Sequence, residues 1–150
     1  MSQDPSQPWH TAYPTPKSQA ATLPRQEVLG WLRGEKVVGR DFLLIDVRRD
    51  DFEGGTIHGS LNLPAQSFYT TMSTLYALVK SSGVKTVVFY CGSCCGRGPR
   101  AAGWFADYLN DKEDFSLQSV ILEGGIKGWV KAGSEYTALI DGFDASVWKQ

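Results

Sequence analysis

Cysteine and histidine are scarce in this sequence of 150 residues, which contains three cysteines and two histidines. The cysteines, Cys91, Cys94 and Cys95, lie within five consecutive positions, too close together to form a spaced disulfide framework. Neither His10 nor His58 is placed to complete a zinc site with these thiols, so no bound metal is predicted. The lack of a disulfide framework favours a reducing compartment, and we expect a cytoplasmic protein, with the nucleus as the alternative location.

Charge of one sign and long hydrophobic runs are also missing. The formal net charge is -1 at pH 7, with acidic and basic residues interspersed, which argues against nucleic acid or an anionic membrane as a partner. No apolar run approaches the ~20 residues of a membrane span, and the first residues lack the basic-then-apolar order of a secretion signal. We therefore expect no nucleic-acid partner and no membrane association, and no pattern specifies an oligomeric state.

The first 21 residues differ in composition from the rest of the chain. They are rich in Pro, Ser, Gln and Thr, with prolines at positions 5, 8, 14 and 16 and no apolar period. This composition predicts a flexible proline-rich arm over residues 1–21, followed by one domain over residues 22–150. Packing of Trp9 and Tyr13 against that domain is an open alternative.

Strand and helix patterns alternate along the domain. Continuous apolar runs predict strands covered on both faces, whereas apolar residues spaced by three and four predict amphipathic helices. We expect a first helix capped by Thr22 and ended by Gly34, and a C-terminal stretch over 133–150 that packs back on the body. Strands are predicted at 42–47, 84–90 and 120–122, and further helices at 67–79, 101–109 and 126–130. This alternation predicts an α/β fold with a mostly parallel central sheet.

Polar segments follow the three predicted strands. Asp46 and Arg48 come at the end of the first strand, and segments 91–97 and 123–125 follow the other two. Ligands of parallel α/β folds bind beyond the carboxyl ends of the strands. We therefore expect the three segments to meet at one crevice.

The segment between Cys91 and Arg97 consists of five small residues, namely Gly92, Ser93, Cys94, Cys95 and Gly96. Its glycines let the backbone curl tightly enough to aim successive N–H groups at one point, where an oxyanion can bind. A cysteine at the base of such a loop, beside a helix N-terminus and a guanidinium, is expected to react as a thiolate. Cys91 is thus the predicted nucleophile and Arg97 the predicted anion-binding residue, against the alternative that Cys91 is a buried structural thiol.

Three segments of the sequence resemble a rhodanese-like domain, which implies a three-layer fold. They are LLIDVRRDDFEGGTIHGSLNLP at 43–64, VVFYCGSCCGRGPRAA at 87–102 and VILEGGIKGWVKAG at 120–133. Sulfurtransferases of this superfamily typically have four residues between the loop cysteine and the closing basic residue, whereas the phosphatase-like branch has five, as this chain does. The run RGPR at 97–100 resembles that of the cell-division-cycle dual-specificity phosphatases, and the small size is similar to that of fungal arsenate reductases and phosphatases.

The resemblance implies cysteine chemistry on a tetrahedral oxyanion, either hydrolysis of a phosphomonoester or reduction of arsenate. Cys91 would attack phosphorus or arsenic in line, the loop amides would hold the equatorial oxygens, and Arg97 would grip two of them. The implied ligands are phosphate, arsenate or a phosphorylated substrate, with no bound cofactor. A reductase also needs a thiol, supplied from outside by glutathione or glutaredoxin, or by Cys94, whose spacing from Cys91 suits a resolving thiol. For Cys94 and Cys95, small loop filler is the alternative.

The general acid is not part of the loop. The resembling phosphatases have a glutamate within the loop and a histidine before the cysteine, whereas this loop has no carboxylate and Tyr90 precedes Cys91. The candidate acids are Glu53, Asp51 and Glu123. The candidate supporting residues are Asp46 and Arg48, with a structural role favoured, and Arg100, which extends the positive field over the pocket.

Three other functions stay open on the sequence alone. Tyr90 and the missing loop carboxylate also fit a thiosulfate-type sulfurtransferase. The spacing of Cys91 and Cys94 fits a thioredoxin-like redox protein. A domain of this fold can also serve as a non-catalytic binding module.

Overall fold

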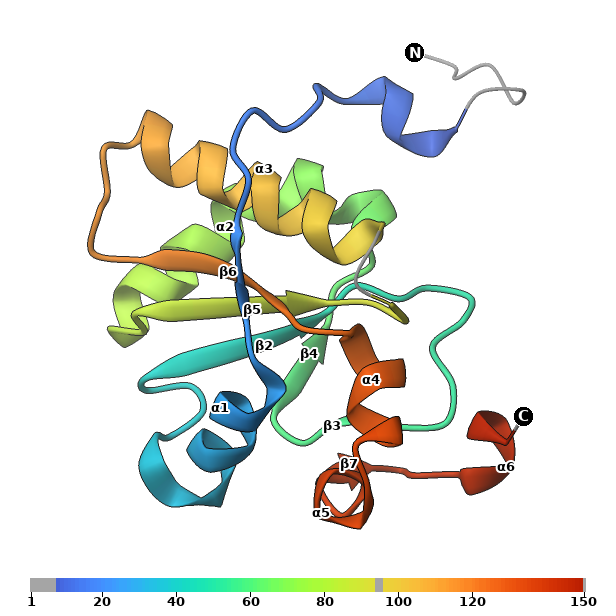
Figure 1. The fold of residues 1–150 in the computed structure, drawn as a ribbon. Helices are drawn as coiled ribbons and strands as arrows, with labels where there is room; N and C mark the ends of the chain where they lie inside the picture. Colours follow the sequence, from blue (N-terminus) through green and yellow to red (C-terminus); the bar gives the residue numbers. More distant parts are fainter. Residues whose placement is uncertain (1–7, 94–95, 150) are drawn as a thin grey trace.

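The computed structural model describes residues 8–93 and 96–149 and centres on one parallel β-sheet (Figure 1). The strand order is β1-β6-β5-β2-β4, and every neighbouring pair is parallel. The strands are β1 (Ala21–Leu23), β2 (Phe42–Asp46), β4 (Ser60–Asn62), β5 (Thr86–Tyr90) and β6 (Gln118–Leu122). A separate antiparallel pair joins β3 (Thr56–Ile57) to β7 (Ile140–Asp141). The predicted α/β fold with a mostly parallel central sheet is confirmed.

Helices cover both faces of the sheet and complete three layers (Figure 1). One face carries α2 (Ala65–Ser82) and α3 (Arg97–Asp111), and the other carries α1 (Arg25–Gly30), α4 (Gly125–Lys131) and α5 (Ser134–Thr137). The shorter elements are the 3₁₀ helix η1 (Trp9–Ala12), the π-type turn η2 (Trp31–Glu35) and α6 (Ala145–Trp148). Within the described ranges, no helix has the length and apolar composition needed to cross a membrane.

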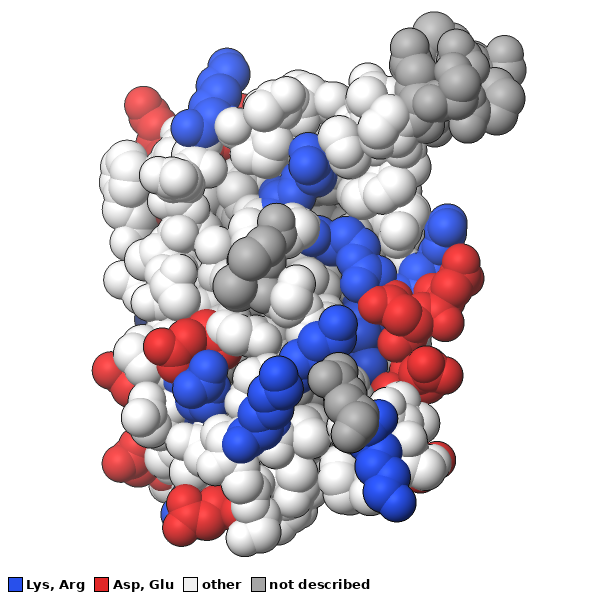
Figure 2. All heavy atoms as spheres, turned by 45° about the vertical axis from the view of Figure 1, so that its right-hand side comes forward, with Lys and Arg blue, Asp and Glu red and all other residues white. Residues whose placement is uncertain are grey.

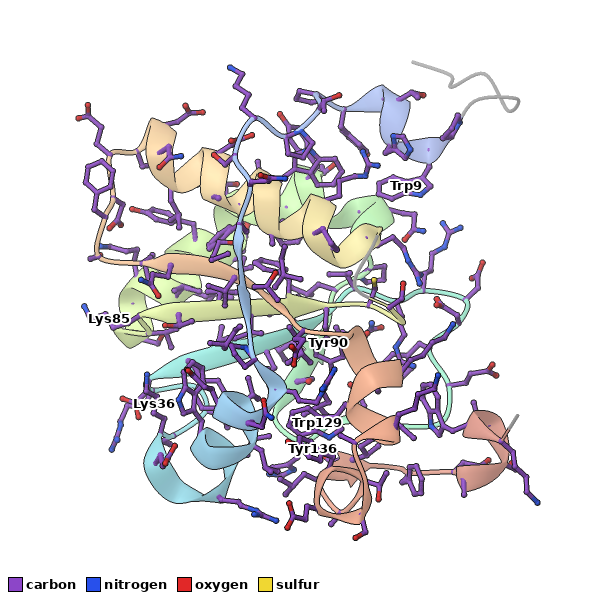
Figure 3. All side chains as sticks on the ribbon, in the orientation of Figure 1. Trp9, Lys36, Lys85, Tyr90, Trp129 and Tyr136 are labelled. Carbon is purple, nitrogen blue, oxygen red and sulfur yellow. The ribbon has the colours of Figure 1, made fainter. Side chains whose placement is uncertain are left out.

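β5 is buried along its whole length because helices cover both of its faces. Successive side chains of a strand point to opposite faces. Phe89 and Cys91 accordingly pack in the core beneath α2 and α3, whereas Tyr90 packs in the core beneath α1 and α4. Figure 3 shows Tyr90 on the same side of the sheet as Trp129 and Tyr136. The cysteine and the tyrosine before it therefore face different layers.

The N-terminal segment packs on the domain over residues 8–21, within the stretch where composition predicted an arm. Trp9 and Tyr13 place their rings edge-on to Trp104 of α3, with centroids 6.0 and 5.8 Å away. Asp107 accepts two backbone N–H groups of the segment at 2.8 Å each. Burial of the two aromatic rings offsets the entropy lost on ordering the segment. The first seven residues lie outside the described part of the chain.

The first helix begins at Arg25 and not at Thr22. Thr22 lies in β1, paired with Ile121 of β6, and Pro24 occupies the N-cap of α1. The prediction that Thr22 caps the helix was wrong because the sheet recruits this backbone as its edge strand, a tertiary pairing that local composition does not encode. The predicted end at Gly34 lies one residue before the end of η2, and Gly34 has the positive φ (123°) of a helix stop.

Candidate active site

The carboxyl ends of β2, β5 and β6 lie side by side because these strands are neighbours in a parallel sheet. Backbone hydrogen bonds join the segments that follow them. Val47 N donates to Tyr90 O (2.9 Å), and Ile126 N donates to Cys91 O (3.0 Å). The three segments that the sequence placed at one crevice therefore meet at one edge of the sheet.

Cys91 lies at the base of the loop, only 2% exposed, beneath the first turn of α3. The helix approaches closely, since a Cβ atom on Gly98 would lie 3.2 Å from the backbone N of Cys91. The positive end of the helix dipole is thereby brought next to the cysteine. The thiol donates a hydrogen bond to Ser93 O (3.0 Å), and this bond must break when the thiol loses its proton.

The turn between β6 and α4 presses a glycine against the loop. Gly125 has a φ of 61°, and a Cβ atom there would lie 2.7 Å from both Cys91 O and Ser93 O. At the third residue of α4, Lys127 N donates to Gly92 O (3.0 Å). This close approach lets the start of α4 bind the loop carbonyls and fix the first residues of the loop.

Replacing Gly125 with alanine is expected to lower both stability and turnover, because the added methyl group would collide with the loop carbonyls. We expect the free energy of unfolding in urea to fall by roughly 2–4 kcal/mol. Gly83→Ala is the matched control, since Gly83 also has a positive φ (81°) but its Cβ position has no neighbour within 4 Å. That control should cost about 1 kcal/mol and leave turnover unchanged. Equal losses in the two variants would mean that the contact with the loop is unimportant.

Arg97, the first residue of α3, directs its guanidinium at the Asp51 carboxylate. Its Nη1 and Nη2 donate to Oδ1 and Oδ2 at 2.7 and 2.5 Å, so the planar fork grips two coplanar oxygens. These hydrogen bonds, with the charge of the guanidinium adding to them, lower the pKa of Asp51 to about 2. Asp51 is therefore a carboxylate at neutral pH and is not a proton donor while the contact lasts.

Asp46 and Arg48 form a buried ion pair whose side chains are 0% and 1% exposed. Arg48 Nη2 donates to Asp46 Oδ2 (2.8 Å), and the same guanidinium donates to the carbonyls of Glu53 (3.0 Å) and Gly55 (2.7 Å). The pair thus ties the end of β2 to the loop that carries Asp51. Its contacts are those of structural support, the role that the sequence favoured.

The other two candidate acids have different surroundings. Glu53 lines a pocket beside Gly92, and Arg48 donates a hydrogen bond to its backbone carbonyl. The Glu123 carboxylate accepts Arg25 N and lies 3.4 Å from Arg25 Nη1, so it is directed at the start of α1. A Cβ atom on Gly124 would meet the same guanidinium, at 2.7 Å. Glu123 is therefore the least suited of the three candidates to protonate a leaving group.

A pocket of about 260 Å³ opens beside Gly92 at this edge of the sheet. Helices α4 and α6 form part of its wall, and the sequence did not assign either helix to the site. Lys127 and Lys131, four residues apart on α4, were the available sequence signal for that helix. Trp148 packs against the core beneath α1 and α4, and its indole N–H donates to Gly54 O (2.9 Å), contacts that the sequence does not reveal. Figure 2 shows basic side chains gathered on this side of the molecule next to an acidic group. The lining residues are Arg48, Asp51, Glu53, Gly92, Lys127, Val130, Lys131, Val147 and Trp148.

Tyr90, which stands where the resembling phosphatases have histidine, faces away from Cys91. Its hydroxyl lies 2.6 Å from Ser60 Oγ and 2.9 Å from Thr56 Oγ1. Burial, together with the negative charge of Asp46, raises the pKa of Tyr90, so the phenol stays neutral. Tyr90 therefore links β3 and β4 to β5 and is not positioned to tune the thiol.

The remaining predicted loop residues are described in part. Gly92 is buried beside the pocket, and Gly96 is the N-cap of α3, where its carbonyl accepts Arg100 N (3.1 Å). Cys94 and Cys95 lie outside the described residues, so the resolving role of Cys94 stays a prediction. In the part of the chain that the structure describes, no group of three His, Cys, Asp or Glu residues is arranged to hold a metal ion.

Sequence comparison relates this chain to known proteins. The family model described as the rhodanese-like domain matches residues 25–132. Arsenical-resistance protein 2 of Saccharomyces cerevisiae is 33% identical over 98 residues, which cover 60% of this chain and 75% of that protein. The dual specificity phosphatase Cdc25 of Arabidopsis thaliana is 38% identical over 93 residues, covering 60% of this chain and 62% of that protein. Arsenate reductase 2.1 of Oryza sativa subsp. japonica is 36% identical, with coverages of 60% and 57%.

Solved structures share the fold. The structure of Ygr203w, a yeast protein tyrosine phosphatase of the Rhodanese family, superposes with a TM-score of 0.70 at 23% identity, covering 88% of this chain and 99% of that one. An As-Sb reductase from Leishmania major gives a TM-score of 0.63 at 21% identity, with coverages of 81% and 84%. These likenesses confirm the predicted three-layer fold.

Proposed function

The chain belongs to the rhodanese-like domain family, and from that membership we propose that it is a cysteine-dependent enzyme acting on a tetrahedral oxyanion, as an arsenate reductase or a phosphatase. The contact between Arg97 and Asp51 carries the proposal. A guanidinium six positions after Cys91 already holds two coplanar oxygens, as it would hold two oxygens of phosphate or arsenate. The printed names of the relatives include both activities.

Cys91 supplies the nucleophile. Once the thiol has lost its proton and its hydrogen bond to Ser93 O, sulfur attacks phosphorus or arsenic in line. A sulfur bond to phosphorus or arsenic forms while the opposite bond to oxygen breaks. Arg97 and the N-terminus of α3 stabilise the negative charge on the equatorial oxygens, and a proton must reach the leaving oxygen.

The two activities differ after this first step. In a phosphatase, water attacks the phosphocysteine and releases inorganic phosphate. In a reductase, a thiol attacks the sulfur of the arsenic adduct, so that two thiols become a disulfide while As(V) is reduced to As(III). Glutathione or glutaredoxin would supply the external thiol, and Cys94 is the internal candidate. No bound cofactor is part of the proposal.

Parallel assays of the reduced protein test the proposal. Hydrolysis of p-nitrophenyl phosphate and thiol-dependent arsenate reduction are measured side by side, and we expect turnover in at least one. Cys94→Ser should leave hydrolysis intact and slow reduction only where Cys94 is the resolving thiol. Absence of both activities, with a stable persulfide on Cys91 after thiosulfate treatment, would assign the chain to sulfur transfer instead.

A further inference from the structure

The Asp51 carboxylate and a bound oxyanion would compete for the guanidinium of Arg97. Both of its Nη atoms donate hydrogen bonds to Asp51 in the structure. The edge formed by these two atoms can hold one pair of coplanar oxygens at a time. An oxyanion that binds through this edge must therefore displace the Asp51 carboxylate.

Asp51 stays at the mouth of the loop when it is displaced. Its backbone carbonyl accepts Arg48 Nη1 (3.4 Å), from a guanidinium that is itself buried. A Cβ atom on Gly92 would lie 3.8 Å from Asp51 Oδ2, so the carboxylate lies over the residue that follows Cys91. The backbone is thus anchored, and rotation of the side chain alone releases the carboxylate toward the pocket that it lines.

We propose that the oxyanion exchanges with Asp51 at Arg97, and that the displaced Asp51 is the general acid that protonates the leaving oxygen. This inference rests on the proposed function and names the group that the loop itself lacks. Asp51 then leaves Arg97, and becomes able to act as the acid, only when a substrate is bound.

The proton balance closes without an external acid. A phosphomonoester near neutral pH is partly a monoanion, since its second pKa is about 6. When its oxygens take the fork, Asp51 loses its guanidinium partner and gains a neighbouring anion, and both changes favour the protonated carboxyl. The substrate's proton passes to Asp51, and then to the leaving oxygen as the bond to sulfur forms. The dianionic phosphoryl group stays on Arg97, and Asp51 returns to a carboxylate.

Charged groups from each neighbouring element affect the protonation of Asp51 during this exchange. Arg97 comes from α3. Lys127 comes from α4, and its Cε lies 3.8 Å from the position of a Cβ atom on Gly92, as far as Asp51 Oδ2 does. Arg48 and Glu53 flank Asp51 within its own loop, and Lys131 lies further along the pocket wall. Cys91 at the base of the loop and Asp46 at the end of β2 both interact electrostatically with Arg97. Once the oxyanion has paired with Arg97, the two lysines favour the carboxylate, whereas Glu53 and the bound anion favour the acid.

The experiment compares Asp51→Asn with Asp50→Asn, which removes the same charge from an adjacent side chain that is 89% exposed. Binding is measured first, with tungstate as the tetrahedral anion and with Cys91→Ser added to each variant so that no chemistry occurs. Asp51→Asn should bind tungstate about tenfold more tightly, because no carboxylate competes for Arg97, whereas Asp50→Asn should match the parent. Unchanged or weaker binding in Asp51→Asn would overturn the exchange.

Turnover is measured second, on two phosphate esters that differ in leaving group. Asp51→Asn should lower kcat about 100-fold on phenyl phosphate, whose leaving oxygen needs a proton, and only slightly on p-nitrophenyl phosphate. An equal fall on both esters would indicate a structural role and overturn the acid assignment. If the parent protein turns over neither ester nor arsenate, the proposed function fails and the acid role fails with it, while the tungstate result still decides whether Asp51 competes for Arg97.

Discussion

Replacing Cys91 with serine is expected to abolish turnover while leaving the anion site able to bind. A serine hydroxyl stays protonated at neutral pH and is a far weaker nucleophile than a thiolate, so kcat/KM should fall by about 10⁴-fold or more. The side chain is 2% exposed, and oxygen is slightly smaller than sulfur, so the core beneath α3 should accept the change. Initial rates on p-nitrophenyl phosphate and arsenate provide the measurement.

Anion binding separates lost chemistry from lost structure in this variant. Arg97 and the N-terminus of α3 are untouched, so we expect tungstate to raise the melting temperature of Cys91→Ser by as much as that of the parent. Arg97→Met is the converse control, because it removes the fork and should abolish that shift. Residual turnover above about 1% in Cys91→Ser would place the nucleophile elsewhere, with Cys94 and Cys95 the next thiols to replace.

The central strands could be predicted because a strand buried on both faces has consecutive apolar residues in the sequence. β2 (FLLID) and β5 (TVVFY) each contain a run of four consecutive apolar residues, since helices cover each face of the sheet. β1 has no such apolar run. Its three residues are exposed or half-buried and become a strand only through pairing with β6, so the local signals of Thr22 and Pro24 suggested a helix start. Pairing between distant segments decided the outcome there.

The candidate site, like the fold, could be predicted only where the signal is local in the sequence. Cys91 and Arg97 could be selected because their spacing is local and the chemistry requires it. The partner of Arg97 is Asp51, 46 positions earlier in the chain, and nothing in the sequence distinguishes Asp51 from Glu53 or Glu123. Their roles diverge only when the fold turns Glu123 toward α1 and anchors the loop of Asp51 through Arg48. Ion pairs between residues far apart in the sequence are therefore the part of the site that only the folded structure reveals.

Arg48→Met is expected to be the most destabilising of the substitutions considered. Removing the guanidinium would leave the Asp46 carboxylate at 0% exposure without its charged partner, and the carbonyls of Glu53 and Gly55 would lose their donor. Removing one partner of a buried ion pair costs about 3–5 kcal/mol, so the free energy of unfolding in urea should fall by that amount. Because Arg48 also anchors the loop of Asp51, turnover at temperatures where the variant is folded should fall too.

A second substitution tests whether the uncompensated charge causes this loss. Adding Asp46→Asn to Arg48→Met removes the buried carboxylate, so the double variant should recover part of the stability that the single variant loses. Arg40→Met is the matched control, because Arg40 pairs with Asp41 at the surface, with 70% of its side chain exposed, and its loss should leave the urea midpoint nearly unchanged. A loss in Arg48→Met no larger than in Arg40→Met would mean that the neighbouring hydrogen bonds hold this loop without the guanidinium. The Asp46 carboxylate also accepts hydrogen bonds from Thr56 Oγ1 and from the backbone N of Arg48. A double variant less stable than Arg48→Met would mean that Asp46 stabilises the fold chiefly through these two hydrogen bonds.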